Sequence, residues 1–137
     1  MKNLSVETRW EGEEAVLALT GELDLSTAGQ VERELEAAEE RKPSRLVIDL
    51  RQVSFLDSTG LRVVLSADGR ARRDGRRLEV IPGPPPVHRV FRIALLDRRI
   101  VFVDPPDDER SEDAPREKSA SDPPGGGVAG SDEGDLR

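Results

Sequence analysis

Apolar and polar residues alternate along the first three quarters of the chain, and the period of the alternation changes between segments. A period of two over residues 4–10 predicts a half-exposed strand, and the apolar run 15–19 predicts a strand deeper in a sheet. Because only the short turn 11–14 separates them, these strands are expected to form an antiparallel hairpin. Three further strands are predicted from apolar runs at residues 46–50, 78–81 and 100–103.

Three stretches between these strands carry apolar residues three and four positions apart, which is the spacing of a helix with one buried face. Pro43 marks the end of the first helix and Gly75 the end of the second, while Gly83 and three prolines begin the third. The three predicted buried faces consist of Ala28, Val31, Leu35 and Ala38; of Leu61, Val64, Leu65 and Ala71; and of Val87, Val90, Phe91, Ala94 and Leu95.

An initial hairpin followed by alternating strands and helices predicts a small α/β domain over residues 1–103. The expected architecture is a mixed sheet of about five strands, an N-terminal antiparallel hairpin followed by β-α repeats, with three or so helices. From residue 104 the pattern stops, and 104–137 is an acidic tail rich in Pro, Gly and Ser. We expect this tail to be disordered, since it cannot bury enough apolar surface to offset the entropy of ordering.

Charge is distributed unevenly between the two regions. Residues 1–103 hold 17 acidic and 17 basic side chains, so the net charge of −7 lies entirely in 104–137. The predicted domain is therefore not a nucleic-acid binder by charge. The chain has no Cys, no apolar signal core at its start and no apolar run of membrane-spanning length, so we expect a cytoplasmic protein without thiolate metal sites.

Two acidic residues lie at positions in the predicted elements that call for a specific hydrogen-bonding role. Asp49 lies inside the most apolar strand, where it requires either a hydrogen-bond partner or an exposed face. Asp24 ends the stretch Gly21-Glu22-Leu23-Asp24, and either Asp24 or Ser26 is suited to capping the first helix.

The run Asp57-Ser58-Thr59-Gly60-Leu61 stands between the central strand and the second helix, and it carries the candidate chemistry. A Ser at a helix start has its hydroxyl beside unpaired N–H groups and the positive end of the helix dipole. The local sequence allows two interpretations, a helix N-cap and a site of phosphorylation. Asp57 next to Ser58 would make an added phosphate a large local change of charge.

This run, following the strand at 46–50, resembles the phosphorylation-site motif of the STAS domain family, in the branch of the bacterial anti-sigma factor antagonists. The resemblance covers about residues 4–103 and includes Gly21 to Asp24 and Arg77 to Val80. Many relatives have another amphipathic helix after the last strand, which this sequence lacks. The resemblance implies phosphorylation at Ser58 and a binding surface for a partner protein formed by Asp24, Asp57, Ser58, Thr59, Gly60 and Leu61.

By the same resemblance, the unmodified protein would bind an anti-sigma factor with Ser/Thr kinase activity and so free a sigma factor for transcription. That partner would phosphorylate Ser58 and end the association, and a PP2C-type phosphatase would restore it. ATP and its metal ion would belong to the kinase, so the chain itself is expected to need no cofactor. A secondary role for Thr59 as acceptor is open, although a Thr at a helix start is usually structural.

Two other functions compete with this switch. A hydrolase with Ser58 as nucleophile needs a positioned base, yet the only His is His88 and no Gly-x-Ser-x-Gly elbow surrounds Ser58. We therefore expect the protein not to be an enzyme. The alternative is a STAS module that acts as a scaffold in a stress-signalling assembly or as a subunit of a lipid or anion transport system.

Overall fold

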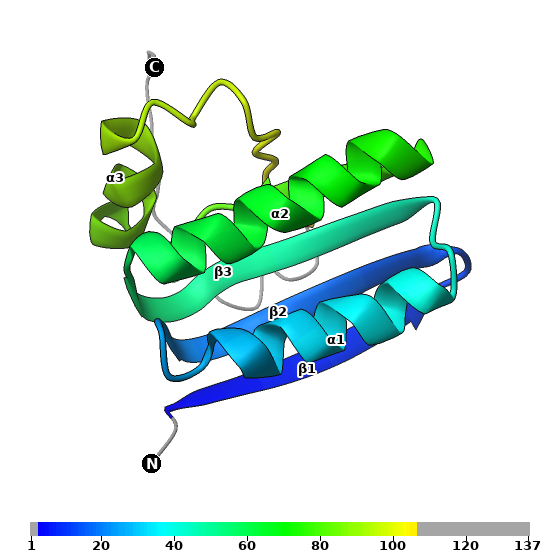
Figure 1. Ribbon diagram of the computed structural model, residues 1–137, viewed down its shortest axis with the longest axis horizontal. Coiled ribbons are helices and arrows are strands. Elements are labelled where there is room, and N and C mark those ends of the chain that lie inside the picture. The colour runs from blue at the N-terminus through cyan, green and yellow to red at the C-terminus, as the bar shows by residue number, and fades with distance from the viewer. Residues whose placement is uncertain (1–2, 107–137) are drawn as a thin grey trace, which may run out of the picture. The chain divides into compact units, whose positions relative to one another are not determined.

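Four strands and three helices alternate along residues 3–106, the part of the chain that the computed structural model describes (Figure 1). They are β1 (Leu4–Glu11), β2 (Glu14–Leu23), α1 (Ala28–Glu40), β3 (Arg45–Leu56), α2 (Ser58–Asp74), β4 (Arg77–Ile81) and α3 (Pro85–Ile93). The tail predicted over 104–137 lies outside the described residues except for its first three positions.

The strands form one mixed sheet in the order β1-β2-β3-β4. β1 and β2 are the antiparallel hairpin, and β2, β3 and β4 run parallel to one another. Helices α1 and α2 lie side by side over the same face of this sheet (Figure 1). The predicted α/β class, the N-terminal hairpin and the three helices are confirmed.

The predicted count of about five strands is wrong, because residues 100–103 do not form a full strand. They contact β4 through a single bridge, in which the Val80 amide donates to the Val101 carbonyl and the Val103 amide donates to the Val80 carbonyl. On one side the Ile100 amide is already used in a turn, where it donates to the Leu96 carbonyl. On the other side β4 ends before Pro82, which has no N–H to extend the ladder.

Strands β2 and β3 both continue past the apolar runs that predicted them. Residues 20–23 and 51–56 lie outside the apolar runs 15–19 and 46–50, yet both segments belong to the sheet. Register shifts between Ala18 and Thr20 and between Gly21 and Glu22 interrupt the alternation of side chains. Since a strand is recognised from a period of two, these irregularities hide its second half from a sequence pattern.

The core lies between the sheet and its two covering helices. Val31 and Leu35 of α1 and Val64 of α2 are fully buried there, as their helical spacing predicted. Val87 and Phe91 attach α3 to the same core. Ala94 and Leu95, however, were predicted to be buried and are exposed, because α3 ends at Ile93 and the chain turns away.

Asp49 is buried on β3 and is paired by a residue two positions further along the strand. The backbone amide and the guanidinium of Arg51 both donate to its carboxylate, with the shortest contact 2.7 Å from Nη2 to Oδ2. This supplies the hydrogen-bond partner that was one of the two alternatives. None of the helices in residues 3–106 combines the length and apolar character needed to cross a membrane.

Candidate functional site

The predicted site residues gather at one edge of the sheet because β2 and β3 are parallel and end together. Leu23, the last residue of β2, is paired with Leu56, the last residue of β3. The loops that begin at Asp24 and Asp57 therefore leave the sheet side by side, at the left end of the molecule in Figure 1. The Asp57 amide donates to the Leu23 carbonyl over 3.4 Å, which joins the two loops directly.

Gly60 lets the start of α2 pack directly against the end of β2. A Cβ at this position would lie 2.6 Å from the Leu23 carbonyl oxygen and 2.8 Å from the Leu23 Cγ. Since the first of these neighbours is backbone, a larger residue would force the helix away from the strand. Gly60 and Leu61 are buried, so they support the site from beneath.

Ser58 is the first residue of α2, and its side chain is exposed. The cap of the helix is Asp57, whose Oδ1 accepts a hydrogen bond of 3.0 Å from the Gly60 amide. Of the two interpretations of Ser58, the N-cap is therefore wrong, because the preceding carboxylate already occupies that role. Within residues 3–106 the Ser58 hydroxyl has no hydrogen-bond partner.

Asp24 organises the neighbouring loop and does not cap α1, and neither does Ser26. The Asp24 Oδ1 accepts hydrogen bonds from the Ser26 hydroxyl at 2.8 Å and from the Ser26 amide at 3.0 Å. These donors, led by the hydroxyl, hold the pKa of Asp24 below its ordinary value. The residue before α1 is Thr27, whose buried hydroxyl donates to the Glu22 carbonyl at 2.8 Å.

Together, these residues form a small polar surface around the exposed Ser58 hydroxyl. Ser58 is exposed, and Asp24, Asp57 and Thr59 are half-buried beside it. Arg62, one helical turn after Ser58, is exposed and has no ion-pair partner in the described part of the chain.

Sequence reasoning missed two exposed apolar residues next to these loops. Leu25 follows Asp24 and is 79% exposed, and Phe55 lies two residues before Asp57 and is 49% exposed. Leu25 could have been noticed, because it is a large apolar residue that belongs neither to a predicted strand nor to the predicted buried face of the following helix. Phe55 could not, since it lies in the irregular half of β3.

His88, the only histidine and so the candidate catalytic base of a hydrolase, lies in an aromatic cluster. Its ring packs edge-on against Phe102 with 4.7 Å between centroids, and it lies 6.3 Å from the ring of Phe91. The described residues contain no hydrogen bond between His88 and Ser58. Among the same residues, no group of three or more His, Asp or Glu side chains is arranged to hold a metal ion.

Comparison with known proteins gives a consistent match over the folded region. The family model described as "Mlab, STAS domain" matches residues 6–104. The anti-sigma F factor antagonist of Paenibacillus polymyxa is 33% identical over 103 residues, which cover 74% of this chain and 88% of that protein.

Solved structures show the same fold. An anti-sigma factor antagonist from Mycobacterium paratuberculosis superimposes with a TM-score of 0.68 at 24% identity, covering 80% of this chain and 92% of that one. The Bacillus cell fate determinant SpoIIAA in its phosphorylated form gives a TM-score of 0.62 at 21% identity, covering 79% and 97%.

The family model spans most of the chain, and the Paenibacillus relative is similar over most of its own length. The chain therefore belongs to the STAS domain family, in the group of the anti-sigma factor antagonists.

Proposed function

We propose that this protein is a cytoplasmic antagonist that binds an anti-sigma factor with kinase activity and is released when that kinase phosphorylates Ser58. The observation that supports the proposal most is the exposed Ser58 hydroxyl, which has no hydrogen-bond partner in the described part of the chain. A kinase can reach this oxygen without unfolding the helix. Its phosphorylation would also leave the cap of α2 in place, since Asp57 provides that cap.

The unmodified surface is suited to protein binding. Leu25 and Phe55 are apolar and exposed beside the two polar loops, and burial of apolar surface drives most protein association. Asp24, Asp57 and Thr59 add hydrogen-bonding groups around Ser58. We infer that these residues form the contact with the anti-sigma factor, with Gly60 and Leu61 holding α2 in position below them.

Phosphorylation would act through charge. A phosphoserine carries about −1.5 to −2 charges at neutral pH, and here it would join the carboxylates of Asp57 and Asp24. An anion left unpaired in an interface costs on the order of 3 kcal/mol, which is about a hundredfold in affinity. Removal of the phosphate by a PP2C-type phosphatase would restore binding, and ATP with its metal ion would belong to the kinase.

The relatives agree with this interpretation. The Paenibacillus protein is named an antagonist of an anti-sigma F factor, and SpoIIAA has been solved in a phosphorylated form. In this proposal the protein has no catalytic activity of its own. Stoichiometric labelling of Ser58 by a Ser-directed covalent probe would contradict that part of the proposal.

The test begins with incubation of the full chain with candidate anti-sigma kinases and ATP, followed by mass spectrometry to locate any added phosphate. Phosphate is expected on Ser58, and Ser58→Ala should bind the kinase but accept none. Ser58→Asp should weaken binding by about a hundredfold. The control is Ser66→Asp, which adds the same charge at an exposed position two turns further along α2 and should bind as the wild type does.

Two results would contradict the proposal. One is phosphorylation at another residue with Ser58 unmodified, and the other is wild-type affinity of Ser58→Asp for the kinase. Recovery of a transport ATPase in place of an anti-sigma kinase when the protein is purified with its partners would favour the transport alternative.

A further inference from the structure

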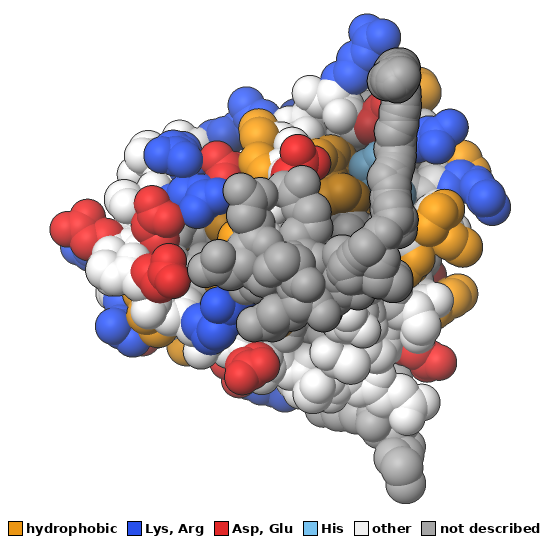
Figure 2. Space-filling model, turned by 180° about the vertical axis from the view of Figure 1, so that it is seen from behind, with side chains coloured by type: hydrophobic (Ala, Val, Ile, Leu, Met, Phe, Trp, Pro, Cys, Tyr) orange, Lys and Arg blue, Asp and Glu red, His pale blue; other side chains and the backbone are white. Residues whose placement is uncertain are grey.

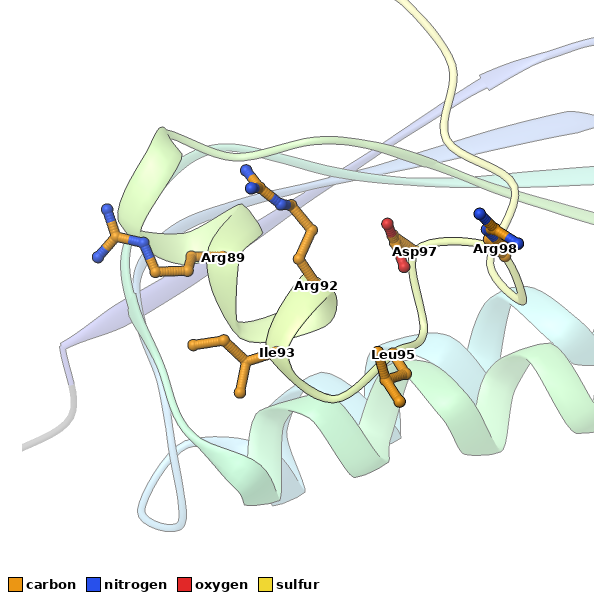
Figure 3. Close-up of a pocket in the computed structure, with 6 residues that line it drawn as sticks. All are labelled: Arg89, Arg92, Ile93, Leu95, Asp97 and Arg98. Atoms are coloured by element: carbon orange, nitrogen blue, oxygen red, sulfur yellow. The ribbon is translucent and has the colours of Figure 1, made fainter.

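The surface at the end of α3 combines exposed apolar side chains with several arginines. Leu95 is 82% exposed, the highest value among the large apolar residues described, and Ile93 is 74% exposed, third after Leu25. Leu95 and Ile93 lie around an open pocket of about 550 Å³ (Figure 3). We define the α3 surface as the residues that line this pocket: Arg89, Arg92, Ile93, Leu95, Asp97 and Arg98.

The local fold holds these apolar residues away from the core. Val87 and Phe91 form the buried side of α3, which leaves Ile93 on the other side. After the helix, Leu95 has a left-handed backbone conformation with φ of 62°, a region that costs a leucine energy. The Leu96 amide then donates to the Phe91 carbonyl at 2.8 Å, so the turn is fixed with the Leu95 side chain outside.

The arginines of the α3 surface form no ion pair with another described residue. Arg89, Arg92 and Arg98 have no ion-pair partner in the described part of the chain, whereas Arg45 and Arg70 elsewhere in the domain each contact a glutamate. Asp97 is the one acidic side chain in the pocket lining, so this surface has a net charge of +2. Arginines around exposed apolar side chains are typical of the residues that contribute most to protein interfaces.

The α3 surface lies at the same end of the molecule as Ser58. β4 is paired with β3 only as far as Asp49, and α3 contacts both β3 and α2. Figure 1 shows α3 next to the end of α2 at which that helix begins, and Figure 2 shows orange and blue side chains together over α3. The α3 surface can therefore extend the binding face proposed above.

We propose that the α3 surface is a second contact site for the anti-sigma partner and receives a segment of it that presents carboxylates around apolar side chains. This inference rests on the proposed function, since it names the chemistry of the same partner. Carboxylates on the partner would complement the net charge of +2 on the α3 surface. A second copy of this chain is disfavoured, because a symmetric dimer would bring the same arginines against one another.

The test measures the affinity of the full-length variants for the kinase partner by calorimetry, at low and high salt. Leu95→Asn removes the apolar side chain and tolerates the left-handed backbone, so it should fold at least as stably and bind about fivefold more weakly. The double variant Arg89→Glu with Arg92→Glu should bind about tenfold or more weakly, with the larger loss at low salt. Its control, Arg33→Glu with Arg73→Glu, changes the net charge equally at exposed positions elsewhere and should bind as the wild type does.

The outcomes separate this inference from the proposed function. Wild-type binding by both α3 variants, with Ser58→Asp still weakened, overturns the inference and leaves the proposed function intact. Weakened α3 variants together with full binding by Ser58→Asp support the inference and contradict the phosphorylation switch. Two other results also overturn the inference. In the first, the Arg variant no longer binds vesicles of phosphatidylcholine and phosphatidylglycerol, while its binding to the partner is unchanged. In the second, the protein associates with itself and Leu95→Asn abolishes this association.

Discussion

Asp57 and Ser58 are adjacent in the chain but have separate tasks. The Asp57 carboxylate accepts the Gly60 amide and closes the start of α2, whereas the Ser58 hydroxyl is exposed and makes no hydrogen bond in the described part of the chain. Because the cap belongs to Asp57, chemical change at Ser58 can alter the surface without loosening the helix. This separation is what a reversible switch at a helix start requires.

A pair of substitutions at Asp57 tests the cap. Asp57→Ala should lower the free energy of unfolding by about 1 kcal/mol, because the Gly60 amide loses its partner. Asp57→Asn should stay within about 0.5 kcal/mol of the wild type, since an asparagine oxygen caps as well as a carboxylate. Urea denaturation measures both, and a Ser58→Ala variant as destabilised as Asp57→Ala would show that the cap had been assigned to the wrong residue.

Arg62 provides a second test at the residue scale, which depends on phosphorylation at Ser58. A phosphate on Ser58 and the Arg62 guanidinium are four residues apart on α2, with the anion nearer the N-terminus, which is the favourable order. Arg62→Gln should therefore lower the stability of the phosphorylated protein by about 0.3–1 kcal/mol more than that of the unmodified protein. Equal losses in the two forms, measured by denaturation at low salt, would contradict the pairing.

At the scale of elements, the site depends on two irregular strands that end at the same place. The register shifts in the β2–β3 ladder carry both strands past their apolar runs, until Leu23 and Leu56 are paired at the edge of the sheet. The close contact of Gly60 with Leu23 then packs the start of α2 against that edge. The Asp24 and Ser58 loops consequently form one surface, although more than 30 residues separate them in sequence.

The segment after α3 is tied to α2 by Asp68, a buried acid. Its Oδ2 accepts from Arg72 Nε at 2.9 Å and from Arg99 Nε at 3.4 Å, and Arg72 also donates to the Arg99 carbonyl. Asp68→Ala should lower the free energy of unfolding by about 1–3 kcal/mol, because it removes the shared acceptor. The control is Asp74→Ala, which removes the ion pair between Arg76 and the carboxylate of Asp74 at the end of the same helix. Because that carboxylate is exposed to water, its loss should cost no more than about 1 kcal/mol.

Hydrogen exchange gives an independent reading of the Asp68 variant. If the carboxylate holds the segment against α2, amides between residues 96 and 103 should exchange faster in Asp68→Ala than in Asp74→Ala. Unchanged exchange there, together with an unchanged unfolding midpoint, would show that the contact contributes nothing measurable.

For the whole molecule, the proposed domain boundary separates a folded region without net charge from an acidic tail. All the residues of the buried core lie between Ala15 and Ile100. A chain that ends at Pro106 should therefore unfold within about 4 °C of the full-length protein and bind the kinase partner with similar affinity. A fall in melting temperature of about 8 °C or more, which corresponds to at least ~1 kcal/mol, would place the boundary too early.

The sequence by itself determined the elements whose pattern is regular and local. The helical stripes of α1 and α2, the hairpin, Gly75 as the end of α2 and Ser58 as its start could all be predicted, since each depends on spacing within one segment. The resemblance in Asp57 to Leu61 likewise identified the family, because the motif is contiguous.

Only the tertiary structure decided how these parts meet. The ends of β2 and β3 depend on the register between the strands. The cap of α2 depends on which side chain accepts a hydrogen bond from the Gly60 amide, and the exposure of Leu95 depends on where α3 ends. Each of these is a contact between groups brought together by folding, and such contacts produce no periodic pattern of apolar residues in the sequence. The shared edge that joins Asp24 to Ser58 is therefore a property of the fold, while the chemistry it carries was already present in the sequence.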